Sequence, residues 1–262
     1  MTSEWIVKKI AKLPLTKSAI LIEGLPGIGN VGKVAVDFLV EDWKAKQICS
    51  FSSHGMPHSV FVNEQNLVEL PSISLYYKKV QGKDVFLLGG DVQPTDEISS
   101  YAFCEAVLQL CKECKIKEIV TLGGVGLQAI PQNPKVYCTA NDSIVMKAYK
   151  KYTKVDTNLY GIVGPIIGVS GLLIGLAKQK KIQAGALLAE TFAHPMYLGV
   201  KGSKEILKII QQRFKIKLNL KELEKEIAEL EEELKEGKEP NKTNSLNKLS
   251  SQLKGNEQNY IG

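Results

Sequence analysis

Arginine is almost absent from this 262-residue sequence: Arg213 is the single arginine, and lysine supplies nearly all the positive charge. The net charge of +6 would by itself suggest a nucleic-acid partner. Arginine, however, is the usual reader of guanine edges and the usual bidentate ligand of phosphate, because its guanidinium is planar. We therefore predict no readout of base sequence and no nucleic-acid partner.

The sequence also lacks a disulfide framework and a secretory signal. Its five cysteines are an odd number at irregular positions, which fits a reducing compartment better than a set of disulfides. Cys111 and Cys114 have C-x-x-C spacing, but no second pair completes a zinc site, so we interpret both as packing residues. The first residues show no basic start followed by an apolar stretch. These observations predict a cytoplasmic protein without a metal site.

Long hydrophobic runs suited to a bilayer are missing too. Residues 159–177 carry no charge over nineteen positions and are nominally long enough to cross a membrane. Five glycines and Pro165 interrupt this stretch, however, and such residues mark turns rather than one continuous helix. We predict a buried strand, a loop and a helix here, and no membrane partner.

The sequence does contain a strand, a glycine-rich turn and a helix in direct succession between residues 18 and 43. Strand formers fill residues 19–22, and from Val31 onward apolar residues recur at spacings of three and four. This succession is the first half of a βαβ unit, so it predicts an α/β fold with a mainly parallel sheet flanked by helices. Further predicted elements are strands at residues 47–51, 116–122 and 182–189, a hairpin of residues 67–77 and 83–90, and a helix at residues 202–214.

The glycine-rich turn comes close to two nucleotide-binding patterns. Residues 27–32 read G-x-G-x-x-G, but the acidic residue that would hold a ribose about 20 positions later is missing. Residues 27–33 read G-x-x-x-x-G-K, but Val34 follows where a P-loop has a hydroxyl for magnesium. A tight turn between a closely packed strand and helix explains the same glycines, and we favour it. The residues of the alternative phosphate loop are Gly27, Gly29, Gly32 and Lys33.

A second glycine cluster, residues 123–126, follows the predicted strand 116–122 and is expected to form a loop at its carboxyl end. Such loops gather at one edge of a parallel sheet, so Gly27, Gly89 and Gly123 are expected to surround one crevice, with Asp91 and Asp142 as its acids. No serine-histidine or paired-carboxylate spacing emerges there. We therefore predict no catalytic residue and no cofactor.

The pattern changes after residue 216, where apolar residues recur at alternating spacings of four and three, the heptad period of coiled coils. Residues 221–239 hold nine Glu against four Lys, a balance of −5 that leaves +11 for the rest of the chain. An acidic appendage on a basic body is typical of a partner-binding segment. Because the repeat is short, packing on the body remains an alternative. The residues of this predicted oligomerisation or docking helix are Leu220, Leu223, Ile227, Leu230 and Leu234.

These observations divide the chain into three parts. Residues 1–216 are expected to form the α/β domain, and residues 217–236 the heptad-patterned helix. Residues 237–262 are polar and contain few apolar side chains, so we expect a flexible C-terminal tail.

Several segments of the domain resemble the family of proteasome assembly chaperone two and its archaeal homologues. They are I-E-G-L-P-G-I-G-N-V-G at residues 22–32, L-L-G-G-D at 87–91, and G-V-S-G-L-L-I at 168–174 followed by A-L-L-A-E at 186–190. The resemblance covers about residues 15–214. It implies a three-layer α/β sandwich similar to that of purine nucleoside phosphorylases. It also implies a non-enzymatic, ATP-independent chaperone or activator that binds the α-ring of the proteasome core particle as a homo-oligomer.

The same resemblance implies a role for the C-terminal residues. Family members that dock on the α-ring tend to end in a hydrophobic residue, a tyrosine and any residue. This chain ends Asn259-Tyr260-Ile261-Gly262, with the tyrosine one position earlier. In the implied contact, the terminal carboxylate pairs with a pocket lysine while the aromatic ring fills the pocket. The candidate partner-binding residues are Tyr260, Ile261 and Gly262.

The leading hypothesis is thus a chaperone of the proteasome core particle that has α subunits and its own copies as partners. One alternative is a nucleotide-dependent ligase or transferase that uses the loop of residues 27–32. Another is a structural oligomer without a client.

Overall fold

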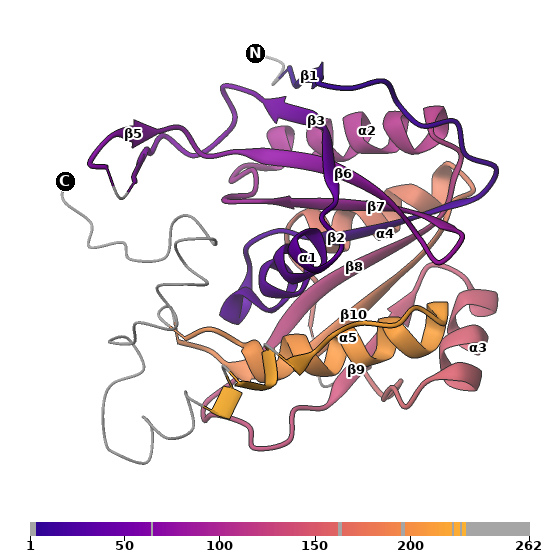
Figure 1. Ribbon diagram of the computed structural model, residues 1–262. Coiled ribbons are helices and arrows are strands. Elements are labelled where there is room, and N and C mark those ends of the chain that lie inside the picture. The colour runs from indigo at the N-terminus through magenta and orange to yellow at the C-terminus, as the bar shows by residue number, and fades with distance from the viewer. Residues whose placement is uncertain are drawn as a thin grey trace.

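The computed structural model describes residues 4–63, 65–161, 164–194, 197–221, 223–225 and 227–228. In this part of the chain, eight strands form one large sheet and two short strands pair separately (Figure 1). The strands of the large sheet are β1 (Ile6–Lys9), β2 (Ala19–Gly24), β3 (Lys46–Ser52), β6 (Ile73–Val80), β7 (Lys83–Gly90), β8 (Ile116–Leu127), β9 (Val136–Ala140) and β10 (Gln183–Phe192). The separate pair consists of β4 (Phe61–Val62) and β5 (Val68–Glu69).

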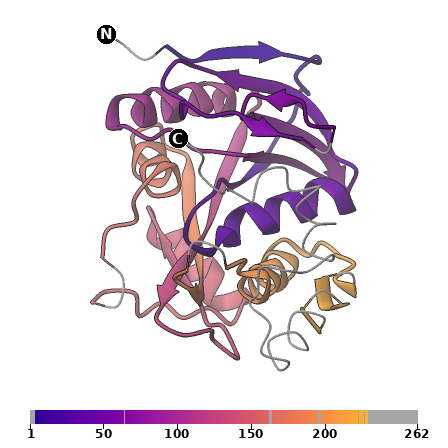
Figure 2. The ribbon, with the colours of Figure 1, turned by 90° about the vertical axis from the view of Figure 1, so that its left-hand side faces the viewer.

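Helices cover both faces of the large sheet and make the α/β fold that the sequence predicts. They are α1 (Val31–Asp42), α2 (Glu97–Glu113), α3 (Ser143–Tyr152), α4 (Val169–Gln179) and α5 (Val200–Phe214), and a short 3-10 helix, η1 (Ile28–Asn30), precedes α1. One face carries α2 and α4 over a core that includes Phe103 and Leu173. The other carries α1, α3 and α5 over a core that includes Leu39 and Ile210 (Figure 2). The sheet is thus the middle of three layers.

The sheet is mixed, which corrects the prediction of a mainly parallel sheet. Its strand order is β1-β3-β6-β7-β2-β8-β10-β9, and only the central block β7-β2-β8-β10 is parallel. The strands β6, β3 and β1 extend one side of this block by antiparallel pairing, and β9 pairs antiparallel with β10 on the other side. The first reversal follows from the turn between β6 and β7. Gln81 and Gly82 both have positive φ, as in the tightest hairpins, and so short a turn joins only antiparallel strands.

The second glycine cluster is part of a strand, so the predicted loop at residues 123–126 is wrong. The strand β8 continues through these glycines because it pairs with β10 from Glu118 to Leu127, with Gly123 opposite Leu188 and Gly124 opposite Ala189. A Cβ atom on Gly124 would lie 2.2 Å from the carbonyl oxygen of Ile28. These glycines therefore make room for the first glycine turn rather than reverse the chain.

All five cysteines are free and buried, as the packing interpretation expects. Burial raises the pKa of Cys114 to about 11 and raises the pKa of Cys111 further, which disfavours a reactive thiolate. Over the described ranges, no cluster of three or more His, Cys, Asp or Glu side chains is placed to hold a metal ion.

The uncharged stretch of residues 159–177 does not form one long helix. Its helical part is α4, which begins at Val169, and the strand expected before the loop is not among the strands of the described residues. Within the same residues, no helix has the length and apolar character needed to cross a membrane.

Candidate functional site

The glycine-rich turn lies at the carboxyl end of β2 and turns the chain into α1. Gly29 and Asn30 have φ angles of 60° and 50°, in the left-handed region that glycine adopts freely and asparagine tolerates. The backbone N–H of Asn30 donates to the carbonyl oxygen of Gly27 at 2.9 Å. No side chain caps the start of α1. The local sequence therefore specifies a compact turn and an abrupt helix start.

Two glycines in this unit let backbone pack directly against backbone. A Cβ atom on Gly24 would lie 2.1 Å from the carbonyl oxygen of Gly32, and a Cβ atom on Gly32 would lie 2.2 Å from the carbonyl oxygen of Leu122. Real Cβ atoms essentially never come closer than 3.0 Å to such atoms. The first turn of α1 is therefore held between β2 and β8 at a distance that only glycine allows.

The start of α1 is covered by protein, unlike the helix end of a phosphate site. Phosphate binds where the first N–H groups of a helix face open space. Here Val31, Gly32 and Lys33 are all buried. The hydroxyl of Ser203 in α5 donates to the carbonyl oxygen of Val31 at 2.8 Å, and the N–H of Gly199 donates to Gly29 at 2.7 Å. This packing supports the structural explanation of the turn.

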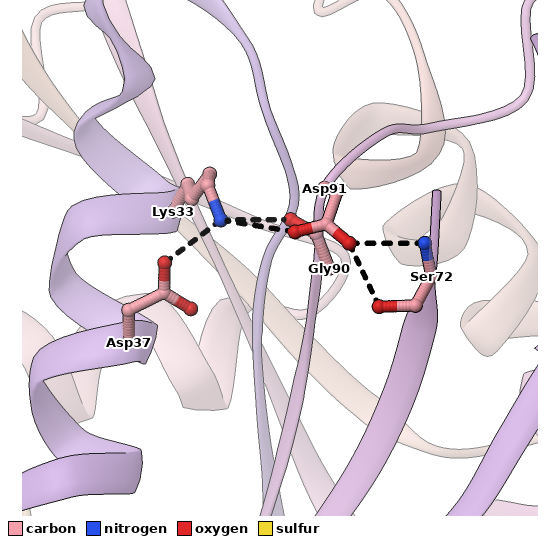
Figure 3. Close-up of polar contacts among 5 residues, drawn as sticks. All are labelled: Lys33, Asp37, Ser72, Gly90 and Asp91. Carbon is pink, nitrogen blue, oxygen red and sulfur yellow. Dashed lines mark hydrogen bonds and ion pairs between the residues drawn. The ribbon is translucent and has the colours of Figure 1, made fainter. Parts of the chain in front are cut away.

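Lys33, the lysine of the near P-loop pattern, is bound by carboxylates (Figure 3). Its Nζ lies 2.9 Å from Asp37 Oδ2 and 3.8 Å from Asp91 Oδ1, and it donates to the carbonyl oxygen of Gly90 at 3.2 Å. The side chain is only 6% exposed. Burial raises the pKa of Asp37 even though Lys33 favours its charged form. The ammonium group therefore joins α1 to the end of β7.

Asp91 extends this network to the chain that enters β6. Its Oδ2 accepts hydrogen bonds from the backbone N–H of Ser72 at 3.0 Å and from the Ser72 hydroxyl at 2.7 Å (Figure 3). Lys33 and Asp91 thus fix the position of residues 70–72, which connect β5 to β6. The aspartate is close to the glycine turn, as predicted, but it has a structural role.

Asp142 does not share a crevice with Asp91, so this part of the prediction is wrong. It caps α3 and accepts a hydrogen bond from the backbone N–H of Ile144 at 2.6 Å. Its neighbour Asn141 bonds to Ala184 at the start of β10. Because β9 runs antiparallel to β10, the carboxyl end of β9 lies at the opposite edge of the sheet from the glycine turn.

A buried carboxyl group that the sequence analysis missed is Glu23. It has no exposed surface, and burial raises its pKa to about 7, while hydrogen bonds from the Leu25 N–H and the Ser170 hydroxyl lower it. The Ser170 hydroxyl lies 2.9 Å from Glu23 Oε2 and ties α4 to the end of β2. The signal in the sequence was an acidic residue inside an otherwise apolar strand.

Gln93 makes a second connection between the turn and α4. Its Nε2 donates to the carbonyl oxygen of Pro26 at 2.8 Å, and its Oε1 accepts from the backbone N–H of Val169 at 3.2 Å. Together with Glu23, this side chain fixes the start of α4 against the glycine turn.

The first part of the heptad segment packs on the domain. Leu223 is buried in the same core as α1 and α5, and Leu220 and Ile227 pack partly against that core. Lys204 of α5 forms an ion pair with Glu224 at 3.1 Å. The remaining predicted residues, Leu230, Leu234, Tyr260, Ile261 and Gly262, lie outside the described residues. The role of this segment in association therefore stays a prediction.

The sequence as a whole matches the model of the PAC2 family over residues 21–237. This chain belongs to the PAC2 family. The resemblance to proteasome assembly chaperone two and its archaeal homologues, which rested on a few short segments, is thereby confirmed.

Several proteins and solved structures are similar to this PAC2-family chain. The crystal structure of Pyrococcus furiosus PbaB, an archaeal proteasome activator, is 27% identical with a TM-score of 0.81 and covers 91% of this chain and 100% of PbaB. An uncharacterised protein of Methanocaldococcus jannaschii, MJ1210, is 28% identical over 87% of this chain and 86% of its own length. P. furiosus PbaA, a homologue of a proteasome-assembly chaperone, shares the fold at 21% identity and a TM-score of 0.72, over 88% of this chain and 90% of PbaA.

The tight glycine packing predicts a large cost for Gly32→Ala. Because the new methyl group would meet the Leu122 carbonyl, we expect the free energy of unfolding to fall by about 3 kcal/mol or more in denaturant titrations. Gly175→Ala is the matched control, since a Cβ atom there meets nothing within 4 Å in another helix. It should stabilise by ~0.5–1 kcal/mol. Equal effects of the two substitutions would contradict this account.

Removal of the Lys33 ammonium should leave two carboxylates without their shared cation. We expect Lys33→Met to lower the free energy of unfolding by about 3 kcal/mol at neutral pH. The exposed Lys178→Met, also on a helix, should change it by less than about 0.5 kcal/mol. The prediction would be contradicted if the natural chain bound ATP and Lys33→Met lost this binding without losing stability. That result would place Lys33 in a phosphate site.

The buried Glu23 should make stability fall as pH rises. Its folded-state pKa is raised from 4.5 to about 7, so the folded protein keeps a proton that the unfolded chain releases, and unfolding becomes easier between these two values. We expect Glu23→Gln to be more stable than the natural chain by ~2–3 kcal/mol at pH 8 and to lose this advantage at pH 4. Chemical denaturation at both pH values measures the difference. A constant difference would show that Glu23 does not titrate in this range.

Proposed function

We propose that this PAC2-family protein is a non-enzymatic, ATP-independent binder of the proteasome core particle that acts in the cytoplasm as a homo-oligomer. The observation that carries the proposal is the likeness to PbaB, an archaeal proteasome activator, which extends over 91% of this chain at a TM-score of 0.81. The family match and the fold shared with PbaA support the same class of function.

The packing of the glycine turn argues against the nucleotide-dependent ligase or transferase. Gly32 is pressed against β8, Gly29 lies against Thr191, and Lys33 is bound by two carboxylates. Of the four glycines from Gly24 to Gly32, Gly27 alone has free space where a Cβ atom would be. A lysine that leaves its carboxylates to bind phosphate would uncover buried charge, which is costly.

The proposal assigns partner binding to the C-terminal part of the chain. Residues 217–236 would form the docking or oligomerisation helix, and the tail of residues 237–262, which the sequence predicts to be flexible, would carry Tyr260, Ile261 and Gly262 to the α-ring. A single short tail binds weakly, but several tails on one oligomer can raise the apparent affinity by about 10² to 10⁴. Oligomerisation and tail docking would therefore act together.

Deletion of the tail should weaken binding to the purified core particle. Full-length protein is expected to be retained by immobilised core particle, whereas a chain that ends at Gly237 should be retained at least about tenfold less, because avidity is lost. Tyr260→Ala should share this defect. The matched control, Tyr160→Ala, removes a fully exposed tyrosine of the α/β domain and should bind normally.

Two outcomes would contradict different parts of this proposal. Unchanged binding after deletion of the tail would contradict the assignment of Tyr260, Ile261 and Gly262 to the contact with the α-ring. If immobilised core particle did not retain the full-length protein, the proposal that this protein binds the core particle would be wrong.

A further inference from the structure

Lysines surround a pocket of about 390 Å³ at the amino ends of β8 and β10. The helices α2 and α4 both end here, and because β8 and β10 are paired neighbours, the residues that lead into these two strands lie side by side. Five lysines and one glutamate line the pocket, a balance of +4. We call these five side chains the lysine cluster: Lys112, Lys115, Lys117, Lys180 and Lys181.

Most of the charge of the lysine cluster has no partner among the described residues. All five side chains are exposed, and only Lys180 has an ion pair there, with Glu105 at 3.0 Å. The carbonyl ends of α2 and α4 favour nearby cations, but each helix end carries only about half of a negative elementary charge. The two helix ends and Glu105 therefore leave most of the positive charge to be balanced by a partner.

An acidic segment that matches this cluster is present in the same sequence. Residues 229–236, which directly follow the described part of the chain, hold five Glu and one Lys, a balance of −4. In the helix that the heptad pattern predicts, Leu230 and Leu234 share one face and have glutamates on both sides. The pocket has the same combination of charged and apolar side chains. Its apolar residues include Leu108, Ile116 and Ile182.

The lysine cluster of the same chain is out of reach for this segment. Glu224 forms an ion pair with Lys204 near the start of α5, which lies beside the glycine turn because Gly199 donates to Gly29. Figure 1 shows the last described residues, in yellow, at the lower left. The pocket lies at the other edge of the sheet and on the other face, and the ten residues of β10 separate the two edges by about 30 Å. A helix rises only about 14 Å from Glu224 to Glu233.

We propose that the lysine cluster of one copy binds residues 229–236 of a second copy. The inference rests on the homo-oligomer of the proposed function and names the surface that receives its predicted oligomerisation helix. Because the segment and the cluster lie at opposite edges of the sheet, the contact is head-to-tail, and such contacts close into a ring when the rotation allows. A ring would gather several C-terminal tails, as avid binding to the core particle requires.

Charge exchange between two full-length variants tests this contact. The cluster variant replaces three exposed lysines: Lys112→Glu, Lys117→Glu and Lys181→Glu. The segment variant replaces three glutamates: Glu231→Lys, Glu232→Lys and Glu233→Lys. In each variant alone, the cluster and the segment carry charge of the same sign, so we expect light scattering to give the 28.9 kDa of one chain.

A mixture of the two variants should recover the molar mass of the natural oligomer. The reversed cluster then meets the reversed segment, and the natural cluster meets the natural segment, so every contact joins opposite charges. This recovery would also show that both variants are folded. The matched control replaces three exposed lysines of α3 and should keep the natural mass: Lys147→Glu, Lys150→Glu and Lys151→Glu.

The inference is overturned if either variant alone keeps the natural mass, or if the mixture stays at 28.9 kDa. A cluster variant of natural mass that has lost binding to double-stranded DNA would assign the lysines to nucleic acid instead. A natural chain of 28.9 kDa would overturn the homo-oligomer and this contact together. If the natural chain and the mixture assemble as expected but core particle does not retain the natural chain, core-particle binding is wrong and the contact stands.

Discussion

The contact on which this structure depends is the meeting of three backbone segments without side chains between them. The first turn of α1 lies between the end of β2 and the middle of β8, and Gly24 and Gly32 are the residues that permit this distance. The left-handed turn at Gly29 and Asn30 delivers the helix to that position. The same contact fixes the position of Lys33, whose buried ammonium group pairs with both Asp37 and Asp91.

A sequence pattern close to a nucleotide-binding loop therefore serves a structural purpose in this PAC2-family protein. In a nucleotide-binding loop, such glycines make room for phosphate, but here Gly24 and Gly32 make room for neighbouring backbone. Lys33, which would bind phosphate in such a loop, pairs with Asp91, and Asp91 binds Ser72 at the base of the β4–β5 hairpin. Among the described residues, several exposed apolar side chains lie outside the large sheet, on and beside the β4–β5 hairpin and around the groove between α2 and α4.

Local patterns predicted the elements well and their pairing less well. The spacing after Val31 gave α1, and the turn at Gln81 and Gly82 gave the β6–β7 hairpin. The antiparallel outer strands and the continuation of β8 depend on partners far away in sequence, so glycine at residues 123–126 was wrongly interpreted as a loop. The place of Asp142 depended on the direction of β9 in the same way. Glu23 was missed because one acid in an apolar strand does not reveal that its partner is Ser170.

Hydrogen exchange measured by mass spectrometry tests the central claim most directly. The account predicts that peptides covering residues 24–33 exchange slowly in the free protein and do not change when ATP, NAD or a nucleoside is added. Peptides covering residues 237–262 should become protected when core particle is added. Protection of residues 24–33 by a nucleotide, with no protection of the C-terminal peptides by core particle, would contradict it.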